Sequence, residues 1–316
     1  MYKRILVPLD GSARAEHALP IAARLAQAGN TTVHLVRVFN TSDAGQALSS
    51  ENMEVERKAA EKYLERTTQS SELAGMRVET QVIQDRGQPA ATIISLARRR
   101  HVDFIVLCSH GYTGKKRLFL GSVAESIARH APCPVLIIRE DGPVPAGLLP
   151  GSSQPTRVLV PLDGSELAEV ALLPAARLAA TLGHPDQGFL HCTRVVILPA
   201  SDQISLSVRE EIIEEAKIYL QRAIAKFHAD LAASTDAMPH LSITSSVTLD
   251  YDVAAGIARL AETGENGLNY QVIAMATHVH SEQESWSMGS ITERVLQSTR
   301  LPMLILLGCA TGPRAA

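Results

Sequence analysis

The sequence predicts an α/β protein made of two similar, doubly wound domains, and three observations lead to this. Short apolar runs typical of buried parallel strands alternate with amphipathic helical segments. The segment ILVPLDGS at 5–12 recurs as VLVPLDGS at 158–165. A stretch rich in Pro, Gly and Ser, 141–156, separates the copies and has the composition of a linker. We therefore expect domains over 1–146 and 147–316.

Two further matches follow in the same order. His110 and the later pair Gly121-Ser122 recur as His278 and Gly289-Ser290. The segment PVLII at 134–138 is echoed by PMLIL at 302–306. Three ordered matches indicate a tandem duplication, and 316 residues suffice for two domains that each bury a core.

The strands of the first copy are identified by their apolar runs. Phe104–Cys108 and Val135–Ile138 have no polar face, which indicates strands buried on both sides of a parallel sheet. The segments 4–9 and 32–39 are similar, whereas 77–84 alternates more and is expected near an edge of the sheet. Together these make five strands.

Four helices alternate with these strands. Ser12 is the expected N-cap of the first, and the second is expected over 51–73. The third, about 89–100, has proline in its first turn, where the missing N–H costs little. The fourth opens at Ser122, and Glu125, three residues on, has the spacing of a capping box.

The second copy follows the same plan, with one long helix at 204–231. Its strands are expected at 157–162, 189–197, 241–249, 270–276 and 303–307. Strands that alternate with helices require right-handed crossovers. Each domain is therefore predicted to be a five-stranded parallel sheet flanked by four helices.

The candidate site lies where two loops leave the sheet. Asp10 ends the first strand and a glycine loop follows the fourth, so both can face one crevice at the carboxyl ends of the strands. In that loop Gly111 is separated by nine residues from Gly121 and Ser122. Glycines let the backbone approach an anion closely, and the free N–H groups of a helix start favour negative charge.

This spacing resembles the ATP-binding signature of the universal stress protein family, G-x-x-G-x9-G-[S/T], with Cys108 at the position of the first glycine. The likeness covers nearly the whole chain and implies the adenine nucleotide alpha hydrolase-like fold, with ATP and Mg as cofactor. It places Asp10 and Val38 near adenine and ribose, and Gly111 with the Gly121-Ser122 pair around the phosphates. The site implied in this way comprises Pro8, Asp10, Val38, Cys108, Gly111, Gly121 and Ser122.

Ordinary structural roles remain open for these residues. Asp10 either accepts a hydrogen bond from adenine or ribose, or caps the turn before Ser12. Gly111 either admits a phosphate or is a plain left-handed turn. Cys108 either crowds the ligand or simply ends its strand, and the cations at 115–117 either screen phosphates or form a solvated loop face.

The second copy of the loop is expected to be a degenerate site. Ala276 and Val279 occupy its two upstream glycine positions, and β-branched valine disfavours the positive φ that glycine allows. The spacer HSEQESWSM adds Glu282 and Glu284 and has no lysine or arginine, which opposes binding of a polyphosphate. The pattern at 290–293 is expected to persist as a capping box.

Composition excludes several classes of function. With 20% charged residues and a net charge of −3, the chain has no overall field for nucleic acid or anionic membrane. The four cysteines lack metal-ligand spacing, and Cys108, Cys133 and Cys309, in or beside apolar runs, are expected to be buried reduced thiols. A strand starts directly after the N-terminus and no apolar run reaches about 18 residues, so we expect a cytoplasmic protein. No Ser/His/Asp, P-loop or zinc pattern indicates catalysis.

The resemblance implies an ATP-binding regulatory or stress-protective protein. Its N-terminal domain would bind the nucleotide, and its C-terminal domain would be an intramolecular partner. The last strands, Val135–Ile138 and 304–307, would then pair into a pseudo-dimer, and a homodimer of whole chains is a further partner expected. The alternatives are a slow ATP hydrolase and a nucleotide-free scaffold that binds a protein.

Overall fold

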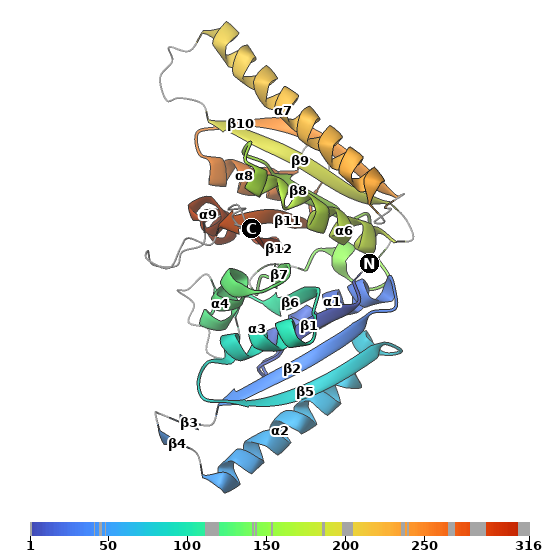
Figure 1. Ribbon diagram of the computed structural model, residues 1–316, viewed down its shortest axis with the longest axis vertical. Coiled ribbons are helices and arrows are strands. Elements are labelled where there is room, and N and C mark those ends of the chain that lie inside the picture. The colour runs from blue at the N-terminus through green and yellow to red at the C-terminus, as the bar shows by residue number, and fades with distance from the viewer. Residues whose placement is uncertain are drawn as a thin grey trace, which may run out of the picture. The chain divides into compact units, whose positions relative to one another are not determined.

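The computed structural model divides into two compact units, Met1–Ser152 and Ser153–Ala316. The structure describes residues 2–40, 42–43, 46–47, 49–110, 120–140, 142, 144–152, 154–184, 187–197, 205–234, 238, 240–264, 269–278 and 289–308. Each unit is an α/β domain with a parallel sheet, and the predicted doubly wound fold is confirmed in both (Figure 1).

The first unit builds its sheet in the order β7-β6-β1-β2-β5, with every pair parallel. These strands are β1 (Arg4–Pro8), β2 (Thr32–Asn40), β5 (Arg77–Asp85), β6 (Phe104–Cys108) and β7 (Val135–Ile138). The helices are α1 (Leu19–Gln27), α2 (Ser50–Thr68), α3 (Pro89–Arg99) and α4 (Ser122–His130). Shorter elements are η1 (Ala15–Ala18), η2 (Ser71–Leu73), η3 (Ala146–Leu148) and the pair β3 (Ser42–Asp43) and β4 (Gln46–Ala47).

The second unit has the equivalent order β10-β9-β8-β11-β12, again parallel throughout. Its strands are β8 (Arg157–Pro161), β9 (Gly188–Ile197), β10 (Leu241–Asp250), β11 (Val272–His278) and β12 (Met303–Gly308). Its helices are α5 (Glu166–Glu169), α6 (Leu172–Gly183), α7 (Leu206–Ala233), α8 (Val253–Thr263) and α9 (Ser290–Ser298).

Helices cover both faces of the first sheet, α3 and α4 on one and α1 and α2 on the other (Figure 1). Successive side chains along β2 point alternately to these two faces of the sheet. Val36 and Val38 point to the face of Ile93 on α3, whereas Arg37 between them stacks on Tyr63 of α2. The strand order reverses direction at β1 and β6, so the carboxyl ends of these two strands flank an opening that both sets of helices leave free.

The first helix of each copy differs from the prediction because it is broken near its start. In the first unit η1 precedes α1, and in the second α5 precedes α6. Pro20 lies in the first turn of α1, and Pro174 lies in the first turn of α6. Since proline has no N–H to donate to the carbonyl four residues earlier, the helical hydrogen bonding is interrupted at these points.

Helix α2 is shorter than the predicted span 51–73. It ends at Thr68, and η2 follows as a separate turn. The hydroxyl of Thr67 donates to the carbonyl of Tyr63, and that of Thr68 donates to the carbonyl of Glu65. These side chains compete for backbone acceptors in the last turn, which favours a helix end here.

Helix α7 is a long helix that buries one stripe only. The hydroxyl of Ser205 caps it by accepting a bond from the N–H of Val208 at 3.4 Å. Its buried residues are Ala216, Leu220, Ala223 and Phe227, spaced three or four apart. Across the described residues, no helix combines the length and the apolar character needed to span a membrane.

We predict that Phe104→Ala destabilises the first unit by about 3–5 kcal/mol. Phe104 is fully buried in β6, and its ring centroid lies 4.4 Å from that of Tyr2, so truncation leaves a cavity at the centre of the sheet. Hydrogen exchange at increasing urea concentrations resolves the unfolding of peptides from each unit. Val55→Ala, at a side chain 60% exposed on α2, should change the same free energy by less than about 0.5 kcal/mol.

Candidate functional site

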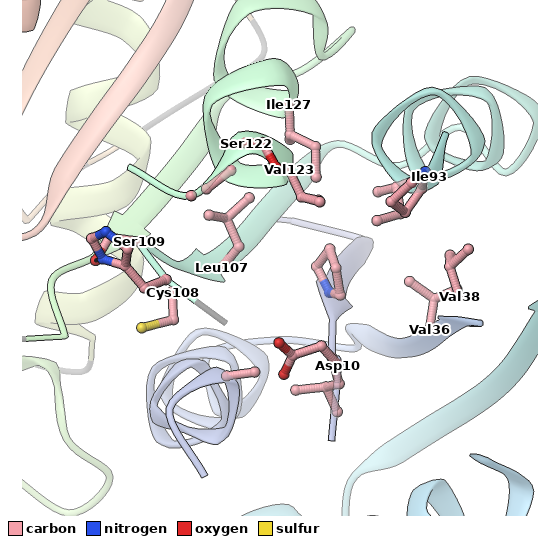
Figure 2. A pocket seen from close by; sticks show the side chains of 17 residues that line it. Asp10, Val36, Val38, Ile93, Leu107, Cys108, Ser109, Ser122, Val123 and Ile127 are labelled. Carbon is pink, nitrogen blue, oxygen red and sulfur yellow. Dashed lines mark hydrogen bonds between the residues drawn. The ribbon is translucent and has the colours of Figure 1, made fainter. Parts of the chain in front are cut away.

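A cavity of about 260 Å³ lies at the carboxyl ends of β1, β2 and β6 in the first unit (Figure 2). Its volume lies just below the usual range of about 300–1,000 Å³ for small-molecule sites. Of the residues predicted from the sequence, the cavity is lined by Pro8, Asp10, Val38, Cys108, Gly121 and Ser122. Gly111, together with the cations at 115–117, lies outside the described residues.

The parallel register explains why these residues meet. Pro8 at the end of β1 pairs with Val36 of β2, and β6 lies on the other side of β1. Both strands therefore end at the same edge, and the loops after them begin at Leu9 and Ser109. The start of α4 closes the remaining side through Gly121, whose N–H donates to the carbonyl of Ser109 at 2.8 Å.

Most of the apolar wall was not predicted from the sequence. It includes Val36, Ile93, Leu107 and Ile127 in addition to Val38. The alternation along β2 could have identified Val36, which points to the same face as Val38. No sequence signal identifies Ile93 and Ile127, because their approach depends on how α3 and α4 pack on the sheet.

Asp10 both holds a turn and lines the cavity. Its Oδ1 accepts a hydrogen bond from the N–H of Ser12 at 3.0 Å and another from the Ser12 hydroxyl at 2.6 Å. The same hydroxyl accepts a bond from the N–H of Ala15 at 3.2 Å. The N-cap of η1 is nevertheless Arg14 and that of α1 is Ala18, so the prediction of Ser12 as the N-cap of the first helix is wrong. In Figure 2 the Asp10 carboxylate and the start of α4 at Ser122 face one space from opposite sides.

The Asp10 turn is supported from the face opposite the cavity. Gly11 has φ +88°, and a Cβ there would lie 2.3 Å from Nη1 of Arg37. The Arg37 guanidinium lies over the Tyr63 ring, 5.0 Å from its centroid. The backbone of the turn, a planar cation and a ring are thus stacked in sequence, which fixes the turn against the sheet.

Helix α4 begins differently from the predicted capping box. Gly121 is the N-cap, with φ −67° and ψ 150°, and its carbonyl accepts the first helical bond from the N–H of Glu125 at 2.9 Å. Ser122 is therefore the first helical residue, and Glu125 is one position too late to cap; its carboxylate pairs with Arg129 instead. The prediction of a Ser122–Glu125 capping box is wrong because glycine takes the extended N-cap conformation.

The start of α4 consequently has no side-chain cap. By contrast, the N-caps of α2, α7 and α8 are Ser49, Ser205 and Asp252, and the side chain of each accepts a bond from a backbone N–H. Within the described residues, no acceptor is found for the first N–H groups of α4, at Ser122 and Val123, which line the cavity. Unpaired N–H groups and the positive end of the helix dipole favour an anion.

Helix α3 is held in place by Asp85 at the end of β5. Its carboxylate accepts bonds from the Thr92 hydroxyl at 2.6 Å, from the N–H of Gly87 at 2.8 Å and from the N–H of Gln88. Burial raises the pKa of Asp85, but the hydrogen bonds together lower it by more than burial raises it. The pKa therefore lies below its ordinary value. This cap positions the first turns of α3, which supply Pro89 and Ile93 to the cavity wall.

Cys108 is a buried, free thiol at the end of β6. Burial raises its pKa, and the nearby carboxylates Glu140 and Asp10 act in the same direction, so the thiol stays protonated and is a poor nucleophile. Figure 2 shows its sulfur directed away from Val36 and Val38. Among the described residues, no three His, Cys, Asp or Glu side chains gather as a metal site would require.

Comparison with known proteins extends over both units. The model of the Universal stress protein family matches residues 1–139 and 155–306. The chain belongs to the universal stress protein family. Two matched regions also confirm the tandem arrangement predicted from the internal repeat.

Individual universal stress proteins match one copy or the whole chain. A protein of Methanocaldococcus jannaschii is 31% identical over 147 residues, which are 44% of this chain and 84% of the relative. A protein of Bacillus subtilis is 33% identical over 150 residues, 44% of this chain and 100% of the relative. The crystal structure of a universal stress protein from Archaeoglobus fulgidus covers 96% of this chain and 98% of its own, with TM-score 0.65 and 20% identity, which shows the shared fold.

The second universal stress protein unit repeats much of this framework. Oδ1 of Asp163 accepts bonds from the N–H of Ser165 at 2.9 Å and from its hydroxyl at 2.6 Å. Helix α9 begins after Gly289 without a side-chain cap, so the predicted Ser290–Glu293 capping box is wrong for the same reason as in α4. The glycine position is retained, and with it the uncapped helix start.

The loop that would decide whether the second unit binds a nucleotide is not described. Val279, Glu282 and Glu284 all lie in 279–288, outside the described residues. Ala276 lies within β11, paired with Leu306 of β12. The degenerate site in this unit therefore stays a prediction.

We predict that Asp85→Asn lowers the stability of the first unit by about 1 kcal/mol at neutral pH, because an amide nitrogen replaces one of the carboxylate oxygens that accept bonds from Gly87, Gln88 and Thr92. Because the folded-state pKa of Asp85 is lowered, its stabilisation is present above the unfolded pKa of about 3.9 and is lost as the pH falls through the folded value. The difference between wild type and variant should therefore shrink below about pH 4.

Urea unfolding at pH 7, 5 and 3.5, followed by hydrogen exchange of first-unit peptides, measures this dependence. Asp230→Asn, on an exposed face of α7, is the control and should leave first-unit stability unchanged at each pH. A wild-type-to-variant difference that stays constant across the series would contradict the assignment of the cap to the ionised carboxylate.

Proposed function

We propose that the first unit binds ATP in its cavity and that the protein is an ATP-binding regulatory or stress-protective protein. The observation that carries this proposal is the uncapped start of α4, which faces the same cavity as the Asp10 carboxylate. N–H donors that can bind an anion lie on one side of this apolar cavity, and a carboxylate that can accept a hydrogen bond lies on the other. This arrangement suits a molecule with a polar base, a ribose and a phosphate chain.

The apolar wall supports binding of the adenine ring. Val36 and Ile93, which are buried, and Val38, which is half-buried, provide an apolar surface at the end of β2 and the first turns of α3. Asp10 lies beside it and can accept a hydrogen bond from the adenine amine or a ribose hydroxyl. Apolar walls with few polar groups that fix orientation are typical of small-molecule sites.

The phosphate chain would lie at Gly121 and Ser122. Gly121 lines the cavity and has no side chain, so a ligand could approach its backbone closely. The Ser122 hydroxyl and the N–H groups of the first turn supply donors. Mg would come with the phosphates, which provide the oxygen ligands that it prefers.

The second unit would act as the intramolecular partner of the first. We propose that the two units pair through their last strands, as the family resemblance implies, and that this pairing rather than a second nucleotide is the main role of 153–316. Solution scattering of the whole chain tests it, since two separated units would give a larger radius of gyration than a paired form.

We predict that isothermal titration with Mg-ATP finds one site per chain, and that Gly121→Val removes it. The valine side chain would fill the space in front of the Ser122 N–H and displace a phosphate. Gly121 has a φ of −67°, which valine also adopts, so the fold should persist.

Gly289→Val is the matched control, because Gly289 is the N-cap of α9 as Gly121 is of α4. It should leave ATP binding unchanged. Loss of binding in Gly289→Val alone would move the site to the second unit, and two sites in the wild type would contradict a degenerate second unit. No binding at millimolar ATP would favour the scaffold alternative.

A further inference from the structure

A cluster of charged side chains lies at the rim of the cavity in the first unit. Nε of Arg14 lies 2.7 Å from Oε1 of Glu140, and Nδ1 of His110 lies 3.6 Å from Oε2 of the same carboxylate. The N–H of Glu140 donates to the Ser109 hydroxyl at 3.2 Å. His110 and Ser109 line the cavity, as does Ala15 next to Arg14, so this rim cluster borders the ligand space.

The strand register identifies the equivalent positions in the second unit. Cys108 pairs with Ile138 in the first sheet as Ala276 pairs with Leu306 in the second. Two residues after these partners come Glu140 and Gly308, respectively.

The other half of the ion pair has an equivalent too. Counting from the Asp-Gly-Ser turns, Leu167 corresponds to Arg14. A Cβ on Gly308 would lie 1.8 Å from Cδ1 of Leu167, so the leucine side chain occupies the place next to this glycine. The second unit has therefore lost the cation and the carboxylate together and has an apolar contact in their place.

The charges of the described cavity residues indicate why a cation such as Arg14 would favour binding of phosphates. Among the described lining residues, Asp10 is an acid and there is no lysine or arginine. A triphosphate brings several negative charges, which the N–H groups of one helix turn offset only in part. Arg14 is adjacent to the lining, its side chain is 40% exposed, and its planar guanidinium suits two phosphate oxygens.

We infer that Arg14 is a ligand of the nucleotide's phosphate chain and that Glu140 restrains it in the free protein. On binding, the guanidinium exchanges the Glu140 carboxylate for phosphate oxygens. A half-exposed ion pair contributes little stability, so this exchange costs little. The inference rests on the proposed ATP site and adds selectivity for nucleoside polyphosphates over nucleosides. The phosphate oxygens must compete with the Glu140 carboxylate for the Arg14 guanidinium, so Glu140 sets the strength of this selectivity.

Titration calorimetry with ATP and with adenosine separates this role from a structural one. We expect Arg14→Leu to weaken ATP binding about tenfold, the effect of one lost charge-assisted bond, and to leave adenosine binding within about twofold. Glu140→Gln, which removes the competing charge and keeps an acceptor, should strengthen ATP binding several-fold without affecting adenosine. The second unit already has leucine at this position, so the fold accommodates it.

Arg57→Leu is the matched control, since Arg57 on α2 is also ion-paired, with Glu54 and Glu61, and does not line the cavity. It should change neither affinity. Equal losses for ATP and adenosine in Arg14→Leu would show a structural role and overturn the inference, as would unchanged ATP binding. Weaker ATP binding in Glu140→Gln would overturn the role of Glu140 as a restraint on Arg14. If the wild-type protein binds adenosine but not ATP, the role of Arg14 is overturned while a nucleoside site remains. If it binds neither ligand, the proposed site is overturned as well.

Discussion

The structure of the first unit depends on the parallel pairing of β1 with β6. Because the strand order reverses here, the connections from these strands pass to opposite faces of the sheet and leave an opening between them. Every candidate functional group enters this opening from a loop or helix whose position follows from that pairing. The Asp10 turn leaves β1, Ser109 and His110 leave β6, and the start of α4 follows.

Comparison of the two units separates features that both units have from features of the first unit alone. Each unit has an Asp-Gly-Ser turn backed by an arginine over a tyrosine ring: Arg37 over Tyr63 at 5.0 Å, and Arg194 over Tyr219 at 4.9 Å. This stack recurs whether or not a rim cluster is present, so it belongs to the framework that holds the turn. The Arg14–Glu140 pair is found in the first unit only and is replaced as a pair, as expected of residues with one joint role.

Local patterns predicted much of the fold. Of the two loop glycines predicted for the site, Gly121 lines the cavity, whereas Gly111 lies outside the described residues. Phe104–Cys108 was predicted with its observed bounds, since a short apolar run between polar residues has few alternatives. The capping box at Ser122 was wrong because the serine pattern competes with an extended glycine one residue earlier, which sequence spacing does not distinguish. Arg14 and Glu140 meet because η1 packs on β6, the strand that pairs with β7, and no local signal connects the two residues.

The departure from the family signature at Cys108 also has a geometric explanation. A side chain at the end of β6 has a direction fixed by the strand, and the Cys108 sulfur is directed away from the valine wall (Figure 2). A glycine is required only where a side chain would enter the ligand space or where φ is positive. Gly121 faces the cavity at the helix start, whereas the residue in position 108 can carry a small buried side chain. For the ATP site that we propose, this geometry leaves room for cysteine at position 108, and Gly121 with Ser122 would be the part of the signature on which binding depends.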